Sequence, residues 1–451
     1  MHRLFSSQTF PVTLLCATIL LSSCEKDISP PVLNVTTRAN SESSYLVSED
    51  EARAAAENIA SSYEIWGQYR EYSAEGGQDT QRVFWGRQQI ESFLAVKSED
   101  GLPAFYISNY AGGGFSLIAA DRHMQPVLAY SEYGSFPLEG LQDYNAVPDG
   151  LITWMETTKA AAVAFRKYPE PENTAPGAEE AWRQITYPCD MGPAMPRSTS
   201  GGSFPLESPT PCPPPVTTTV TRGPLVPSNW GQGQGTVFSS RTYNLYCPPS
   251  PNWFYRYHSP TGCLATAMAQ IMYRWNRPAS YQWGLMLPNS ATNETAQLMY
   301  DAGVSVNTVY GDNSSSARTY NAIRALHTNF GYNMARWLTY SGNGTAYSTV
   351  TDNITAGMPV IIEGNSAQSS DLFSSWPSGV GHAWVCDGYQ RVTIPIRGSN
   401  TWVSYLSFHM NWGWDGTANG LFRFDDWTIR VSGQPDISFP YFNSAIIDIR
   451  P

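Results

Sequence analysis

The stretch TGCLATAMAQIMYRW, residues 261–275, joins a Gly-Cys step to a segment with one apolar face. Its large apolar side chains recur at the spacing of an α-helix, at Leu264, Met268, Ile271, Met272 and Trp275. We therefore predict a helix that begins beside Cys263. Free backbone N–H groups and the dipole at a helix amino end favour an anion, so a thiolate nucleophile can stand there. The alternative is a buried structural cysteine. A catalytic role for Cys263 requires a base, an orienting group and an oxyanion donor elsewhere in the chain.

Length and composition favour an acidic globular protein of several domains. The chain has 451 residues, 42% of them hydrophobic, which is enough for two or three domains. Its 27 Lys and Arg are outnumbered by 38 Asp and Glu, and no basic run is present that could follow a phosphate backbone. We therefore expect no nucleic acid partner. The cysteine spacings contain no CxxC pair, so we predict no metal site, and we expect no cofactor.

The amino end, residues 1–23, has the pattern of a lipoprotein signal peptide. An apolar stretch after Arg3 ends in LSSC at residues 21–24, which resembles a bacterial lipobox. We expect lipidation of Cys24 and a polar tether over residues 24–44, with an ordinary secretory signal as the alternative. No later stretch approaches the roughly 18 apolar residues of a spanning helix. The expected location is the bacterial cell envelope, at the outer membrane or cell surface, with release where the chain is cut.

Cysteine counting supports a free thiol. Once Cys16 leaves with the signal and Cys24 is acylated, the remaining cysteines are Cys189, Cys212, Cys247, Cys263 and Cys386. Their number is odd, so at least one thiol stays unpaired. That suits a reactive cysteine and equally a chain without disulfides. Cys189 and Cys212 lie in one stretch and could pair with each other, so the sequence leaves the disulfide state open.

Residues 45–168 have the pattern of a small α+β domain. Helices are predicted from Ser48 to about Ser62, with an acidic first turn, and from Pro148 to about Arg166. Strand patterns separated by Gly, Asp and Pro turn residues lie between them, at 92–97, 104–108, 114–120 and 127–130. We therefore predict a meandering antiparallel sheet.

Residues 169–223 are rich in Pro, Ser and Thr. Such a stretch cannot bury a core, so we predict an extended linker that is open to proteases. Arg197 and Arg222 are basic cleavage points within it. A permanent linker between two domains would have the same composition.

Residues 224–451 indicate a compact α+β domain with two lobes. Beyond the 264–275 helix, further helices are predicted at about 294–302 and 317–330. The last of these should end at Gly331 and bury Tyr320, Ile323, Leu326 and Phe330. Strands are predicted at 359–363, 382–387, 402–409, 420–424 and 445–449. Helices first and antiparallel strands afterwards predict a cleft where a thiol at a helix end faces groups carried on strands.

A thiol nucleophile needs an imidazole base, and His382 is the candidate among six histidines. It follows a glycine-rich turn at residues 378–381 and begins an apolar strand, so its ring should reach the cleft. Of the others, His2 leaves with the signal. The rest are predicted in the first domain, a loop, a helix and a buried strand, at His123, His258, His327 and His409. A structural histidine is the alternative for His382 taken alone.

The sequence NWGWDG, residues 411–416, supplies a group to orient the imidazole. The Asn411 amide can accept from a ring N–H without adding a charge, and the Trp412 and Trp414 indoles can screen that bond from water. Asp387 is the competing orienter, but we expect it to project to the other face of its strand.

The oxyanion formed during acyl transfer needs hydrogen-bond donors. The backbone N–H of Cys263 is one. The side-chain amide of Gln232 is a candidate for the second, and Gln234 is the alternative because the segment nearly repeats itself.

Together these motifs resemble the streptopain family of cysteine peptidases, a branch of the papain-like fold. The matching stretches follow the family's order over nearly all of residues 224–451: WGQ at 230–232, TGC at 261–263, GHAWVCDG at 381–388 and NWGW at 411–414. The first domain is similar to the family's inhibitory propeptide through GGFSLIAAD at 113–121 and PVLAYS at 126–131. The resemblance implies the roles of nucleophile, base, oxyanion donor and orienter for Cys263, His382, Gln232 and Asn411, with Trp412 and Trp414 packed around the pair.

Two features depart from related enzymes. The CGSCW context of plant papains is absent, and with it their disulfide. The long linker and Pro-Pro-Ser-Pro at 248–251 have no counterpart in the family, which leaves the cleavage point and one edge of the cleft open.

The sequence thus predicts a zymogen of a cysteine endopeptidase that acts on protein or peptide substrates. Residues 45–168 would serve as an intramolecular inhibitor, and an activating protease would cut within 169–223. An apolar P2 residue in the substrate is implied by the resemblance. The alternatives are an acyltransferase or amidase with the same triad, and an inert surface binding protein. The joint presence of the cysteine, histidine, asparagine and glutamine disfavours the inert protein.

Overall fold

The computed structural model describes residues 45–62, 64–72, 78–87, 89–141, 147–186, 218–233, 242–250, 258–339, 345–365, 381–395, 402–424, 427–433, 437–439 and 444–451. The predictions for the signal peptide and Cys24 fall outside these residues, as do those for Cys189, Cys212, Arg197 and Gln234. In the part of the chain that is described, no helix combines the length and apolarity needed to cross a bilayer.

The first domain begins with helix α2 (Glu49–Ser62). Ser48 and Glu51 form a capping box, in which the Glu51 N–H donates to Ser48 Oγ over 3.3 Å and the Ser48 N–H donates to Glu51 Oε2 over 3.0 Å. The predicted helix start is therefore confirmed, one residue after Ser48. A second long helix, α3 (Asp149–Lys167), lies where the sequence predicts it.

The antiparallel meander is confirmed. Its strands pair in chain order as β3 (Ile90–Lys97), β4 (Pro103–Tyr110), β5 (Phe115–Ala119) and β6 (Val127–Ser131). A hairpin of β1 (Glu64–Tyr72) and β2 (Gln78–Arg87) precedes them, which the sequence analysis missed. Its residues are mostly polar and charged, so they lack the apolar alternation on which strand prediction depends.

The C-terminal half places its helices before most of its strands, as expected. The helices are α5 (Cys263–Trp275), α6 (Asn293–Ser305), α7 (Asn321–Thr328) and α8 (Thr345–Thr355). The main strands are β10 (Arg336–Thr339), β11 (Val360–Asn365), β12 (Gly381–Pro395), β13 (Trp402–Asn411), β14 (Gly420–Arg423) and β17 (Ser444–Ile447). Short two-stranded sheets are formed by β8 (Val309–Tyr310) with β9 (Ser315–Ser316), and by β15 (Trp427–Ile429) with β16 (Ile437–Phe439).

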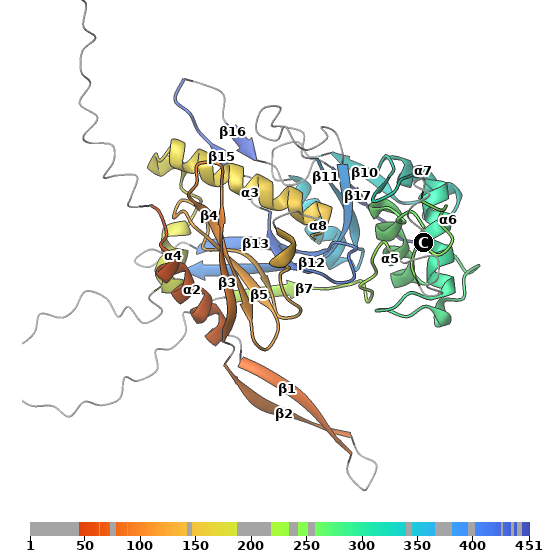
Figure 1. Cartoon of the computed structure of the whole chain (residues 1–451), viewed down its shortest axis with the longest axis horizontal. Helices are drawn as coiled ribbons and strands as arrows, with labels where there is room; N and C mark the ends of the chain where they lie inside the picture. The colour runs from red at the N-terminus through yellow and green to blue at the C-terminus, as the bar shows by residue number, and fades with distance from the viewer. Residues whose placement is uncertain are drawn as a thin grey trace, which may run out of the picture. The chain divides into compact units, whose positions relative to one another are not determined.

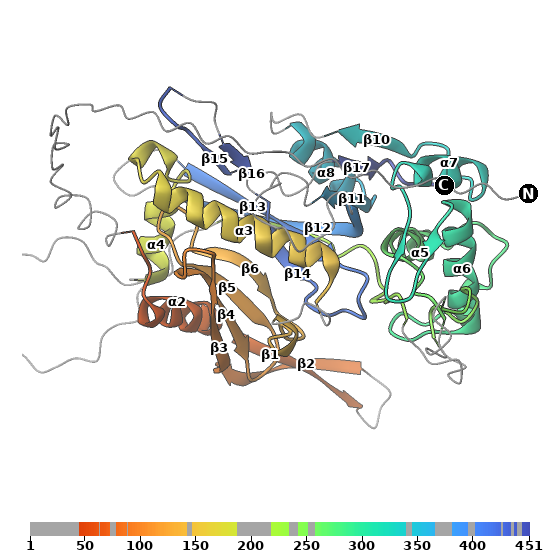
Figure 2. The same cartoon turned by 45° about the horizontal axis from the view of Figure 1, so that its top comes forward.

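One sheet runs through both halves of the chain, in the order β10-β17-β11-β12-β13-β14-β6-β5-β4-β3. The join is the antiparallel pairing of β14 with β6, which sets Leu421 opposite Tyr130 and Phe422 opposite Ala129. Figures 1 and 2 show α3 lying along this region, while α5 and α6 form a separate helical body beside β12. The α+β class is thus confirmed, and the first domain is an extension of the C-terminal sheet.

Two hydrophobic cores lie on opposite faces of the sheet at β12. Ala383 and Val385 belong to the core around α5, whereas Trp384 and Cys386 belong to the core that includes α3. This alternation follows from the pleat of a strand that is buried on both faces.

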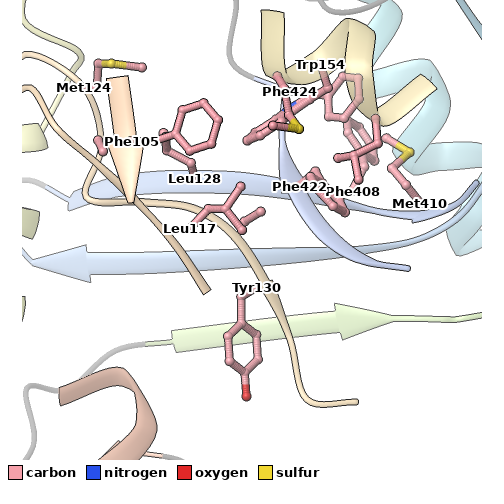
Figure 3. Close-up of a cluster of buried hydrophobic side chains, with 14 of the residues drawn as sticks. Phe105, Leu117, Met124, Leu128, Tyr130, Trp154, Phe408, Met410, Phe422 and Phe424 are labelled. Atoms are coloured by element: carbon pink, nitrogen blue, oxygen red, sulfur yellow. The ribbon is translucent and has the colours of Figure 1, made fainter. Parts of the chain in front are cut away.

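The core on the α3 side is shared between the two halves of the chain. Figure 3 shows part of it, where first-domain side chains meet side chains of β13, β14 and the residue after β14. The Trp154 ring of α3 packs edge-on against Phe422, with 5.2 Å between centroids, and against Phe105, with 6.3 Å. The Trp154 indole N–H also donates to the Arg423 carbonyl over 3.0 Å.

The region predicted as an extended linker, residues 169–223, differs from that prediction at both ends. Helix α4 (Ala178–Thr186) packs on the first domain through the buried Trp182, whose indole donates to the Met124 carbonyl over 2.8 Å. Strand β7 (Thr218–Arg222) pairs with β12 although all five of its side chains are exposed. Composition alone missed both, because one buried tryptophan anchors α4 and β7 is held by backbone hydrogen bonds that any side chain allows.

The predicted helix at 317–330 is shorter than expected. It spans α7 (Asn321–Thr328), and Tyr320, predicted to be inward, is 66% exposed and stacks edge-on against Trp337. Leu326 and Phe330 are buried as predicted. The predicted cap at Gly331 is wrong, because the C-cap is Asn329; Gly331 follows two residues later with φ +79°, a conformation that glycine adopts easily.

Candidate active site

The amino end of α5 is fixed by a glycine that no other residue could replace without strain. Gly262 is the N-cap and has φ +89°. A Cβ there would also lie 3.1 Å from the Ser315 carbonyl oxygen. The first helical turn closes on the Gly262 carbonyl, which accepts from the N–H and the hydroxyl of Thr266, both over 3.1 Å. Cys263 is therefore the first residue of α5, as the sequence predicts.

The three cysteines in the described part of the chain are unpaired, and they differ in exposure. Cys247 and Cys386 are buried, whereas Cys263 is partly exposed. Burial raises the pKa of the Cys247 thiol to about 12 and that of Cys386 well above its ordinary value. These two thiols remain protonated near neutral pH, which leaves Cys263 as the candidate nucleophile among the described cysteines.

Gln232 lies directly beside the start of α5. Its backbone carbonyl accepts a hydrogen bond from the Thr261 N–H over 3.1 Å, two residues before Cys263. Its side chain is partly exposed, while the preceding Trp230 and Gly231 are buried. The structure thus brings two predicted site residues, Gln232 and Cys263, to one place.

His382 is the second residue of β12 and pairs with Gly364 of β11. It is 6% exposed. By the two-residue period of the strand it lies on the face that carries Trp384, opposite the face where Ala383 and Val385 pack with α5.

Asn411 is the last residue of β13 and is 2% exposed. Its Nδ2 donates to the Ser228 carbonyl over 2.7 Å and to Gln270 Oε1 over 3.1 Å. Its Oδ1 accepts from Gln270 Nε2 over 3.1 Å and from the Gly413 N–H over 3.2 Å. The amide therefore uses two donors and two acceptor positions within this network, so accepting from an imidazole would displace or share one of these bonds.

Asp387, the competing orienter, serves a different histidine. Its Oδ1 accepts from His409 Nδ1 over 2.6 Å, and its Oδ2 accepts from the Val226 N–H over 2.9 Å. A break in the β12–β13 register between Cys386 and Gly388 accompanies this arrangement. The hydrogen bonds given for the Asp387 carboxylate thus go to His409 and Val226.

Trp412 and Trp414 follow Asn411 in a turn beside β12. Trp412 is 3% exposed and packs against Trp384, with ring centroids 5.2 Å apart. Its indole N–H donates to the Ala418 carbonyl over 3.0 Å. Trp414 is partly buried. Residue 150 of α3 approaches both Trp384 and Trp412 so closely that only glycine fits, because a Cβ there would lie 2.7 and 2.9 Å from their rings.

A hollow of about 890 Å³ opens beside the Gln232 segment. It is lined by Gly233, Tyr243, Leu287, residues 289–293 and Asp415. Two of these, Gly233 and Asp415, directly follow predicted site residues in the sequence. The hollow therefore borders the segments that carry Gln232 and Trp414.

Gln270 belongs to the candidate site although the sequence does not predict it there. Gln270 lies on α5 and is fully buried, yet it hydrogen-bonds to Ser228, Trp230 and Asn411. The sequence signal that could have identified Gln270 is a polar residue between Ala269 and Ile271 in a helix expected to be buried. No group of three or more metal-ligating side chains occurs among the described residues.

Comparison with protein families finds two models that match this chain. One, described as the Peptidase C10 family, matches residues 279–422, and the other, described as the Spi protease inhibitor, matches residues 44–161. The first contains His382 and Asn411, while Cys263 and Gln232 lie before its first matched residue. The second covers most of the predicted propeptide domain.

Individual proteins are similar over most of the chain. Streptopain of Streptococcus pyogenes serotype M1 is 24% identical over 394 residues, which cover 77% of this chain and 80% of streptopain. The thiol protease/hemagglutinin PrtT of Porphyromonas gingivalis is 25% identical over 365 residues, covering 73% of this chain but 34% of PrtT. A fragment of Prevotella intermedia prointerpain A has a similar fold, with a TM-score of 0.51 and 18% identity over 81% of this chain and 99% of the fragment.

Proposed function

Because this chain is a cysteine peptidase precursor of the streptopain family, with an inhibitor domain before its peptidase domain, we propose that Cys263 is its nucleophile. The observation that carries this proposal is the Thr261–Gln232 hydrogen bond, which sets an amide-bearing segment against the N-terminus of the helix that begins with a partly exposed cysteine. The other described cysteines are buried.

The proposed reaction has two half-reactions. The Cys263 thiolate attacks the peptide carbonyl carbon, and the C–N bond breaks as the amine takes a proton from the His382 imidazolium. This leaves a thioester acyl-enzyme. Water then attacks the thioester, giving its proton to His382, and the carboxylic acid leaves as the C–S bond breaks. The Cys263 N–H and the Gln232 amide donate to the oxyanion in both steps.

We propose that Asn411 supports the imidazole, with Trp412 and Trp414 shielding it from water. Support for this comes from Asn411 being buried at the end of β13, which pairs with the strand that carries His382. In the precursor the Asn411 side-chain oxygen already accepts from Gln270 and Gly413. Asn411 pairs with Val385 on the α5 face, whereas His382 lies on the α3 face of the precursor, so their engagement would require activation to rearrange this end of β12.

Residues 45–168 are proposed to keep the peptidase latent. In their favour, β6 extends the peptidase sheet at β14, and α3 covers Trp384 and Trp412, which neighbour His382 and Asn411 in the sequence. Removing this domain would uncover the face of the sheet that carries both tryptophans.

The activating cut is proposed to lie within residues 187–217. Helix α4 is anchored to the first domain by Trp182, and β7 is anchored to the peptidase by its pairing with β12. A cut between them would leave both of these attachments intact. Arg197 lies in this interval, whereas Arg222 is within β7. The protease that makes the cut is a separate partner.

The proposal has four further parts: a lipid anchor at Cys24, a location at the bacterial outer membrane or cell surface, release on cleavage, and an apolar P2 preference. The first three rest on the lipobox-like sequence, and the last on the family resemblance. Metabolic labelling with a fatty acid, compared between the natural chain and Cys24→Ala, tests the anchor. A library of fluorogenic peptides that vary at P2 tests the preference.

The central test is cleavage of casein by the full chain after limited proteolysis. We expect Cys263→Ala to lower kcat/KM by about 10⁴-fold or more, since removal of a nucleophile abolishes the covalent path. Cys247→Ala is the matched control and should retain activity, because its thiol is buried and protonated. Casein cleavage that persists in Cys263→Ala would refute the proposal.

A thiol-reactive peptide epoxide separates the alternatives. Labelling of Cys263 only after proteolysis supports a latent peptidase, and the absence of labelling in both states favours an inert binding protein. Product analysis with an added amine acceptor distinguishes hydrolysis from acyl transfer.

A further inference from the structure

Gln270 is a polar residue in an apolar place. It lies on α5 two turns beyond Cys263, and it is 0% exposed. A primary amide removed from water destabilises the fold unless its hydrogen bonds are made within the protein. The hydrogen bonds that Gln270 makes therefore indicate its role in the protein.

The Gln270 side chain joins two other segments to α5. Its Oε1 accepts from the Trp230 N–H over 3.1 Å and from Ser228 Oγ over 3.2 Å. It also forms a reciprocal pair with Asn411, each amide nitrogen donating to the oxygen of the other over 3.1 Å.

Backbone groups fix the orientation of both amides. The Trp230 N–H can only donate, so the Gln270 atom that faces it is the oxygen. The Ser228 carbonyl can only accept and the Gly413 N–H can only donate, so the nitrogen and oxygen of Asn411 are assigned in the same way. The oxygen and nitrogen atoms of both amides are thus assigned in the precursor.

We propose that Gln270 is a positioning residue. It holds two parts of the chain on α5, the helix that begins with Cys263: the segment from Ser228 to Gln232, which carries the proposed oxyanion donor, and the end of β13. This inference rests on the proposed function of Cys263. Trp230 is two residues before Gln232, and Asn411 opens the turn that contains Trp412. Through these two attachments a single side chain on the nucleophile helix sets the distance from Cys263 to the groups that act on the substrate carbonyl and support the base.

The effect is expected in catalysis because small displacements matter there. Without the Gln270 amide, the Trp230 N–H and the Asn411 amide lose a buried partner, and their segments shift to regain hydrogen bonds. A displacement of about 1 Å among reacting groups can lower a rate by roughly 100-fold. Gln270 itself does not meet the substrate, since it is fully buried.

The test compares Gln270→Met, which keeps an unbranched side chain but loses the amide, with Gln270→Glu, which keeps acceptors for Ser228 and Trp230. Each full chain is activated by limited proteolysis, and its active sites are titrated so that only folded enzyme is counted. We expect kcat to fall about 10- to 100-fold in Gln270→Met with KM changed less than about threefold, and less in Gln270→Glu. In Gln270→Met, the pH dependence of the rate at which iodoacetamide alkylates Cys263 should shift, because the His382 imidazole is no longer held in place.

Asn353→Leu is the matched control. Asn353 is 4% exposed, and its amide accepts from the Asp448 N–H over 2.7 Å and donates to the Thr349 carbonyl over 3.0 Å. Its loss should lower Tm while kcat and the alkylation profile stay unchanged. If both Gln270 variants behave like Asn353→Leu, or if neither folds, Gln270 is structural and the proposal is overturned. If the natural chain cleaves no peptide, the proposed function fails instead, and the alkylation profile still reports on Gln270.

Discussion

The two faces of the peptidase sheet are covered in different ways. On the α5 face, the helix is joined to neighbouring segments by buried, directional hydrogen bonds from Gln270 to Ser228, Trp230 and Asn411. On the α3 face, the first domain contributes mainly apolar side chains, and Gly150 lets its helix approach Trp384 and Trp412 closely.

We relate this contrast to how long each contact must last: the α5 contacts stay in the active enzyme, and the α3 contacts belong to the precursor. Hydrogen-bonded amides specify one geometry, which suits groups that must stay aligned during catalysis. Apolar contact is less directional, so it can stabilise a precursor without defining the geometry of the site. The comparison predicts that changes at the hydrogen-bonded amides of the α5 face impair chemistry, whereas changes at the apolar contacts of α3 affect latency or stability of the precursor.

The largest effect after removal of the nucleophile is expected on the α5 face, at Gln232. Gln232→Ala removes the side-chain amide but keeps the backbone carbonyl that accepts from Thr261. We expect kcat to fall about 100- to 1000-fold, as for loss of one oxyanion donor, with a smaller change in KM. Steady-state kinetics of the activated chain measure this.

Gln234→Ala is the control for that prediction, because Gln234 is the alternative donor. If Gln234→Ala shows the loss and Gln232→Ala does not, the oxyanion assignment moves to Gln234.

An intermediate effect is expected on the α3 face, at Gly150. A leucine there would place its Cβ 2.7 Å from the Trp384 ring and 2.9 Å from the Trp412 ring, so α3 must move away. Overpacking of this kind costs about 1–3 kcal/mol. We expect the uncleaved Gly150→Leu chain to label at Cys263 several-fold faster than the natural precursor, as measured with the peptide epoxide.

Ala160→Leu, at a half-buried position of the same helix, should leave the labelling rate near that of the natural precursor. Equal labelling of Gly150→Leu and the natural chain would show that this contact has no part in latency.

The smallest effect is expected at Ser48. Ser48→Ala removes the capping box of α2, which should lower the unfolding free energy of the precursor by about 1 kcal/mol. The kcat of the activated enzyme should not change, because α2 belongs to the first domain.

Thr292→Ala removes a comparable cap of α6, where Thr292 Oγ1 accepts from the Thr295 N–H over 3.2 Å. This change should lower the Tm of the activated enzyme as well. A Ser48→Ala change that lowers the Tm of the activated enzyme equally would contradict the division between the two regions.

Much of the fold could be predicted from local patterns. The helix start at Ser48, the meander and the Gly-Cys helix start depend on neighbours in the sequence, and the structure has all three. The β1–β2 hairpin and β7 escaped prediction, since their side chains carry little apolar alternation. Helix α4 was hidden in a segment of disorder-prone composition, because its stability depends on Trp182 meeting a distant carbonyl.

The candidate site divides in the same way. Cys263 and Gln232 were selected from motifs, and the structure sets them side by side through the Thr261 N–H. Gln270 was not selected, because within the helix it reads as one polar residue among apolar ones. Its partners Trp230 and Asn411 lie 40 and 141 residues away, a relation that a single sequence does not display.

By itself, the sequence determined the residue types of the site, the glycine that must precede the cysteine and the order of the two domains, because these depend on local chemistry and on motifs that survive in a linear string. Only the tertiary structure decided that one sheet runs through both domains and that Gln270 ties the nucleophile helix to Asn411. Strand pairing and buried hydrogen bonds join residues far apart in the chain, so their partners are chosen by packing.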